Sequence, residues 1–142
     1  MLKKQSVSFY TAFASALCAL LGLILFFVTD DTMGYAVQDG TSAVICTLIA
    51  LLACGASLFL QLKNVSELFV TYLRVIAMGL MMAALTITLA DRAVVAGGLF
   101  TWNSLDVHAW NAFYTGIACI VFQALAAILL VMSGCLKQSK QA

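Results

Sequence analysis

Four long apolar stretches, separated by short polar connections, dominate the pattern of the chain. Their approximate bounds are 9–28, 43–62, 68–90 and 108–133. A helix rises about 1.5 Å per residue, so each stretch is about long enough to cross the roughly 30 Å hydrocarbon core of a bilayer. The pattern therefore predicts an all-α integral membrane protein that crosses the membrane four times.

The composition supports this prediction. The chain of 142 residues is 64% hydrophobic and 9% charged, whereas about a quarter of the residues in a soluble domain are charged. The polar connections are too short to form a separate soluble domain, so residues 1–142 are predicted to form a single membrane domain. The net charge is +1 and no basic block is present, which argues against nucleic acid as a partner.

The start of the chain combines Lys3 and Lys4 with the apolar stretch 9–28, a combination that is also typical of a signal peptide. Ala14 and Ala16 have the spacing of a cleavage site, but only a short apolar stretch precedes them and a long one follows. We therefore expect this stretch to remain as a membrane anchor.

The basic residues lie mainly on one side of the four predicted spans. Six of the seven lysine and arginine residues fall there, and Arg92 alone falls on the other side. The six are Lys3, Lys4, Lys63, Arg74, Lys137 and Lys140. Short connections rich in lysine and arginine stay in the cytoplasm. The distribution predicts an antiparallel four-helix bundle with both termini cytoplasmic. Together with the expected uncleaved anchor, it favours the bacterial cytoplasmic membrane, with a eukaryotic membrane as the alternative.

Small residues recur along one face of each predicted span, where they would allow helices to approach closely in lipid. These stripes are Ala14, Cys18 and Gly22 in the first span, Ala50 and Cys54 in the second, Gly79 and Ala83 in the third, and Ala112 and Gly116 in the fourth. We predict that they pack against one another inside an up-down-up-down bundle. Contact with a partner protein is the alternative interpretation.

Few polar side chains lie within or beside the spans. Asp91 and Arg92 at the outer end of the third span are interpreted as an interfacial pair, with Arg92 either extending to the lipid phosphates or bonding Asp30 or Asp31. Arg74, about two turns into that span, is expected to extend to the opposite surface in the same way, and a polar cleft at that position is the alternative. Gln123 lies near the middle of the fourth span, and an amide in hydrocarbon is expected to find an interhelical hydrogen bond. The alternative is that Asp91, Arg92 and Gln123 form a gate or line a path for a solute.

The sequence offers little for catalysis or metal binding. No aspartate or glutamate lies deep in a span, which disfavours a proton-coupled pump. The five cysteines form no CxxC pair, and His108 is the single histidine, so a bis-histidine haem within one chain is excluded. No nucleophile–base arrangement and no glycine-rich phosphate loop is visible. We predict no catalytic residues, no metal site and no cofactor, and therefore no enzyme.

Two classes of function remain. The first is a small non-catalytic accessory or structural subunit of a larger membrane complex, which would contact the lipid bilayer and either another membrane protein or further copies of itself. Its predicted docking surface is a group of outer aromatic residues, namely Phe100, Trp102, Trp110, Phe113 and Tyr114. The alternative class is a small homo-oligomeric channel or carrier for a small solute or ion. That class would need a continuous polar stripe on one helix face, and the polar positions here are scattered.

Overall fold

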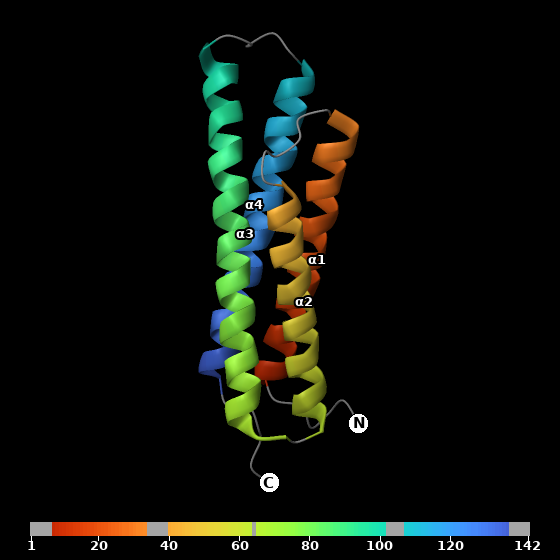
Figure 1. The fold of residues 1–142 in the computed structure, drawn as a ribbon, viewed down its shortest axis with the longest axis vertical. Coiled ribbons are helices and arrows are strands. Elements are labelled where there is room, and N and C mark those ends of the chain that lie inside the picture. Colours follow the sequence, from red (N-terminus) through yellow and green to blue (C-terminus); the bar gives the residue numbers. More distant parts are fainter. Residues whose placement is uncertain (1–6, 34–39, 64, 102–106, 137–142) are drawn as a thin grey trace.

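The computed structural model describes residues 7–33, 40–63, 65–101 and 107–136 (Figure 1). These residues form four α-helices: α1 (Val7–Met33), α2 (Gly40–Leu62), α3 (Glu67–Thr101) and α4 (Val107–Cys135). By length and composition, each helix is able to cross a membrane. The predicted all-α fold of four long apolar helices is therefore confirmed.

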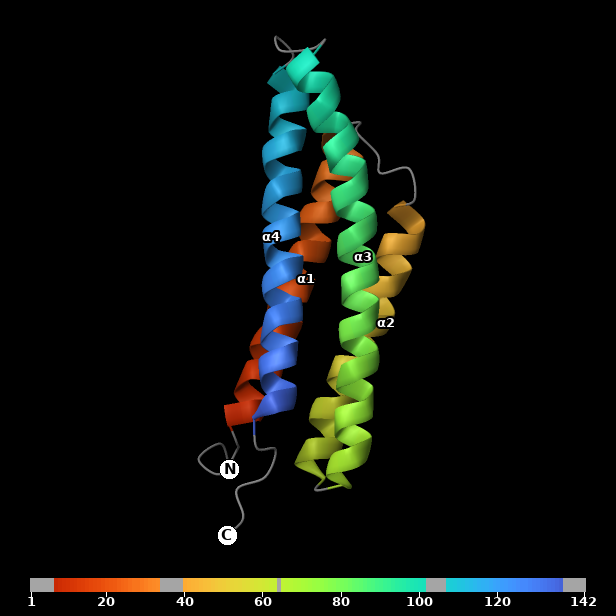
Figure 2. The ribbon, with the colours of Figure 1, turned by 90° about the vertical axis from the view of Figure 1, so that its left-hand side faces the viewer.

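The four helices pack side by side, and consecutive helices run in opposite directions (Figure 1). Helix α1 lies beside α4, and α2 lies beside α3 (Figure 2). The end where α1 and α3 begin and α2 and α4 end is called the terminal end below, and the opposite end is called the far end. Two hydrogen bonds between α1 and α4 fix this antiparallel register, from Ser8 to the carbonyl of Ser133 and from Ser15 to the carbonyl of Ala126.

The buried positions follow a seven-residue repeat in α1, α2 and α4 and in α3 as far as Thr88, after which Arg92 and Leu99 lie one residue out of register. In α1 the two buried series are Ser8, Ser15, Gly22 and Thr29, and Ala12, Ala19 and Phe26. In α4 they are Ala112, Cys119, Ala126 and Ser133, and Ala109, Gly116, Gln123 and Leu130. Two buried positions in every seven residues is the pattern of helices that cross at a small left-handed angle, as in most four-helix bundles. Here most of these positions hold small or polar residues, which suits helices that associate in lipid by close packing.

The structure confirms part of the predicted small-residue stripes. Gly22, together with the predicted pairs in α2 and α4, lies in the bundle interior. The prediction for α3 is wrong, because Gly79 and Ala83 lie on its exposed face and a Cβ atom on Gly79 would meet no atom within 4 Å. Ala77 and Ala84 occupy the interior instead. Helix α3 carries small residues on both faces, so small size alone does not identify the buried one.

Helices α3 and α4 extend past α1 and α2 at the far end (Figure 1). Helix α3 has 35 residues, which corresponds to about 52 Å, well beyond the roughly 30 Å of a hydrocarbon core. The predicted third span ended at residue 90, but the helix continues to Thr101 through Gly97 and Gly98. The far ends of α3 and α4 thus form a helical pair that projects beyond the rest of the bundle.

Candidate functional site

Arg74 joins all four helices at the terminal end. Its side chain is only 2% exposed. From α3, Nη1 donates to Ser8 Oγ in α1 at 2.6 Å and to the carbonyl oxygen of Ser133 in α4 at 2.9 Å, while Nη2 donates to Gln61 Oε1 in α2 at 2.6 Å. The prediction that Arg74 extends to the membrane surface is therefore wrong, because residue 74 belongs to the inward-facing series of α3. These four residues are called the Arg74 cluster below.

The Arg74 cluster supplies hydrogen-bond donors to a backbone carbonyl at the C-terminal end of α4. The last four carbonyl groups of a helix have no partner within that helix, and the C-terminal end carries partial negative charge. Ser133 lies in the last turn of α4, and its carbonyl accepts from both Arg74 and Ser8. The positively charged guanidinium of Arg74 in α3 therefore caps the C-terminal end of α4, where positive charge is favourable.

Arg92 occupies the same face of α3 near the far end. It follows Arg74 by about five helical turns, or about 27 Å along the axis, and it is 4% exposed. The expectation that it extends to lipid phosphates is wrong, since its side chain lies against Gly116 of α4. Asp91 is at the limit of ion-pair distance, with Oδ2 4.0 Å from Arg92 Nε. A gating role for these two residues remains a prediction, and so does a bond from Arg92 to Asp30 or Asp31, whose side chains lie outside the described part of the structure.

Gly116 makes room for Arg92, which gives a testable consequence. A Cβ atom at this position would lie 2.9 Å from Arg92 Cδ and 3.2 Å from its Cγ and Nε. We expect Gly116→Ala to lower the free energy of unfolding by about 1–2 kcal/mol, because the middle of a confined side chain has to move. Unfolding of the purified protein in detergent measures the loss.

The matched control for Gly116→Ala is Gly79→Ala on the exposed face of α3, where an added Cβ meets nothing within 4 Å. This substitution should leave stability unchanged or raise it slightly, because alanine favours the helix. Equal losses in the two variants would contradict the close packing of Arg92 on Gly116.

Gln123 lies near the middle of α4 and is 1% exposed. The expected interhelical hydrogen bond is not formed by its oxygen, since Oε1 has no hydrogen-bond partner among the described residues. The side chain instead packs against α1, where a Cβ atom on Gly22 would lie 3.2 Å from Gln123 Cγ. At this level α1 and α4 are joined by hydrogen bonds that the sequence did not predict. In one of them, Cys119 Sγ donates to the carbonyl oxygen of Gly22 at 3.2 Å.

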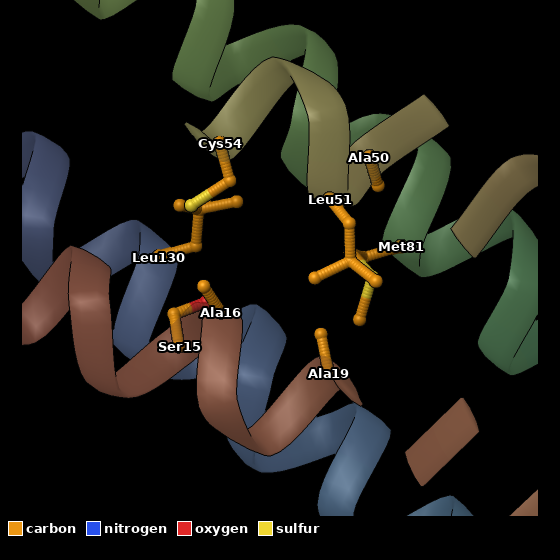
Figure 3. Close-up of a pocket in the computed structure, with 8 residues that line it drawn as sticks. All are labelled: Ser15, Ala16, Ala19, Ala50, Leu51, Cys54, Met81 and Leu130. Carbon is orange, nitrogen blue, oxygen red and sulfur yellow. The ribbon is translucent and has the colours of Figure 1, made fainter. Parts of the chain in front are cut away.

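An apolar layer separates the polar residues at the two ends of the interior. Arg74 and its partners lie on the terminal side, and Thr88, Arg92 and Gln123 lie on the far side. Between them is a cluster made of Ala19, Ala50, Cys54, Ala77, Met81, Ala126, Ala127 and Leu130. A small pocket in this layer is lined almost entirely by apolar side chains (Figure 3). The hydroxyl of Ser15, which also lines it, donates to the carbonyl of Ala126. Within the described part of the chain, no continuous polar path crosses the bundle.

The projecting ends of α3 and α4 carry a cluster of aromatic rings. Phe100 lies edge-on to Trp110 and Phe113, with centroids 5.6 and 6.2 Å apart, and Trp110 stacks on Tyr114 at 6.0 Å. The structure thus brings together four residues of the predicted docking surface, whereas Trp102 lies outside the described residues. Phe100 and Tyr114 are 68% and 62% exposed. These four residues are called the aromatic cluster below.

The described residues offer no obvious place for a metal, since no group of three or more histidine, cysteine, aspartate or glutamate side chains comes together among them. All five cysteines are free thiols, and Cys54 and Cys119 are buried as small packing residues. Comparison of the chain with known protein families, curated proteins and solved structures finds no match.

Proposed function

We propose that this chain is a small non-catalytic membrane protein that serves as an accessory subunit of a larger membrane complex. The observation that carries the proposal is the apolar layer across the interior. Transport of a polar solute through one chain would need a polar path, and catalysis would need a cavity with several convergent polar groups. Because the interior of the described chain offers neither, its function lies on its outer surfaces.

The aromatic cluster is the proposed docking surface, and another integral membrane protein is its proposed partner. Large aromatic side chains are frequent anchors at protein interfaces, and edge-to-face contacts hold the rings of this cluster in fixed orientations. The cluster also lies on the far ends of α3 and α4, and its Phe100 and Tyr114 side chains are mostly exposed, so that a partner has access to them.

The proposed orientation places both termini in the cytoplasm and the aromatic cluster at the outer boundary of a bacterial cytoplasmic membrane. Six of the seven basic residues of the sequence belong to the terminal side, which supports this orientation through the positive-inside rule.

Native mass determination after extraction in a mild detergent tests the proposed function. We expect the wild-type chain to leave its native membrane with a stoichiometric larger partner. Phe100→Ala should lose most of that partner, because it removes one of the exposed anchors of the aromatic cluster.

The matched control for Phe100→Ala is Phe69→Ala, which removes a similarly exposed ring from the opposite end of the same helix, 65% exposed against 68%. This variant should keep the partner. A wild-type chain that emerges alone or only as a homo-oligomer contradicts the proposal. Flux assays with Asp91, Arg92 and Gln123 replaced in turn would then test the channel or carrier alternative.

A further inference from the structure

The guanidinium of Arg74 has one fully anchored nitrogen and one sparsely bonded edge. Nη1 donates to both Ser8 and Ser133, whose side chains are completely buried. The other edge consists of Nε and Nη2. Nη2 donates to Gln61, and Nε is buried without a hydrogen-bond partner among the described residues. This second edge is the one that a guanidinium uses to bind two oxygens of one anion.

The charge of Arg74 is also incompletely balanced. Its three partners are a hydroxyl, a backbone carbonyl and an amide oxygen, all of them neutral. Among the described residues, no carboxylate lies within ion-pair distance of it. An arginine side chain remains charged at any physiological pH, and buried charges are normally paired. The partial charge at the end of α4 offsets only part of this charge.

Gln61 Oε1 occupies the hydrogen-bond position on Nη2 that an incoming anion would take. Gln61 lies in the last turn of α2 at the terminal end and is partly exposed, whereas Ser8 and Ser133 are not. Rotation of the Gln61 side chain away from Arg74 would free Nη2, while Nη1 would keep its bonds to α1 and α4. An anion with two oxygens would replace one neutral bond by two charge-assisted bonds.

We propose that Arg74 binds a phosphate-type anion through its Nε–Nη2 edge, in exchange for Gln61. The phosphate of a lipid headgroup and free inorganic phosphate share this chemistry. Arg74 is about 10 Å along α3 from Glu67, where the helix begins, a depth at which a headgroup phosphate drawn toward the bundle meets the guanidinium. This site is separate from the aromatic cluster and does not depend on the proposed docking function.

Binding to the purified full chain in a neutral, lipid-free detergent tests the proposal. One arm titrates inorganic phosphate against chloride at equal ionic strength and follows the thermal unfolding temperature. The other arm adds phosphatidylglycerol and counts retained lipid molecules by native mass spectrometry. Wild-type protein should bind in at least one arm. Binding only in the lipid arm assigns the site to a headgroup, and binding of free phosphate assigns it to a soluble anion.

Three variants test whether the anion binds at the Nε–Nη2 edge of Arg74. Gln61→Ala should bind roughly tenfold more tightly, because the competing hydrogen bond is gone. Arg74→Lys should bind roughly tenfold more weakly, because an ammonium group cannot present the two-nitrogen edge. Lys63→Gln removes an exposed charge at the same end of the bundle and should leave binding unchanged.

Two results would overturn the proposal. The first is the absence of binding in both arms for the wild type and for Gln61→Ala, a variant that leaves the anchoring bonds of Arg74 to α1 and α4 in place. The second is an equal loss of binding in Lys63→Gln and Arg74→Lys, which would show general attraction to surface charge.

Discussion

Replacement of Arg74 by alanine is expected to lower the free energy of unfolding by about 3–5 kcal/mol. The substitution removes hydrogen bonds from α3 to each of the other three helices and empties one of the largest fully buried side-chain volumes. The amide of Gln61 and the carbonyl of Ser133 lose their charged donor at a depth where little water is present to replace it. Reversible unfolding of the purified protein in detergent micelles, followed by helix content, measures the change.

The matched control is Val75→Ala, the neighbouring position on the exposed face of the same helix. It should change stability by less than about 1 kcal/mol, because its side chain contacts lipid or detergent in both proteins. Removal of Arg74 also relieves the cost of burying a charge. Equal stability of Arg74→Ala and Val75→Ala would mean that this relief cancels the lost hydrogen bonds, and that the Arg74 cluster does not stabilise the fold.

The existence and order of the helices could be predicted because a bilayer limits what an apolar stretch can form. Backbone groups in hydrocarbon must be satisfied within the segment, so a stretch such as 43–62 has little alternative to a helix. Where α3 ends was not predictable in the same way. Beyond residue 90 the helix leaves the predicted span, and Gly97 and Gly98 are compatible with either a helix or a turn.

Which face of each helix points inward was much harder to predict. Lipid and protein interior are both apolar, so hydrophobicity does not separate the two faces of α3. The depth of Arg74 along the helix suggested extension to the surface, whereas its rotation about the helix axis places it in the interior. The polar and small residues at 8, 15, 22 and 29 were an available signal. Their seven-residue spacing in α1 marks the buried face.

The two candidate sites also differ in whether the sequence alone could predict them. The aromatic cluster was predictable because Phe100 and Trp110 flank one short connection, and an antiparallel helix pair brings such residues together. The Arg74 cluster was not predictable, because Ser8, Gln61 and Ser133 come from three other helices and meet only when all four registers are fixed. Sequence therefore located the site formed by neighbouring segments and missed the site formed by the whole bundle.

Ala126→Leu should be the second severe substitution, with an expected loss of about 3 kcal/mol or a failure of α1 and α4 to pack. Ala126 is completely buried, and Ser15 Oγ reaches its carbonyl oxygen at 2.6 Å, so the two helix backbones are very close at this level. A leucine side chain has no room there, and the separation of the helices that it forces would also break the Ser15 hydrogen bond. Detergent unfolding and the yield of folded protein measure the effect.

The control for Ala126→Leu is Ala83→Leu on the exposed face of α3, which should change stability by no more than about 0.5 kcal/mol in a single chain. The contrast tests which small residues serve internal packing. If Ala83→Leu is as damaging as Ala126→Leu, the face of α3 that carries Gly79 and Ala83 is covered in the assembled protein. Loss of a homo-oligomer in that variant would identify a second copy of the chain as the cover, and would shift the balance from the accessory-subunit proposal to a homo-oligomeric assembly.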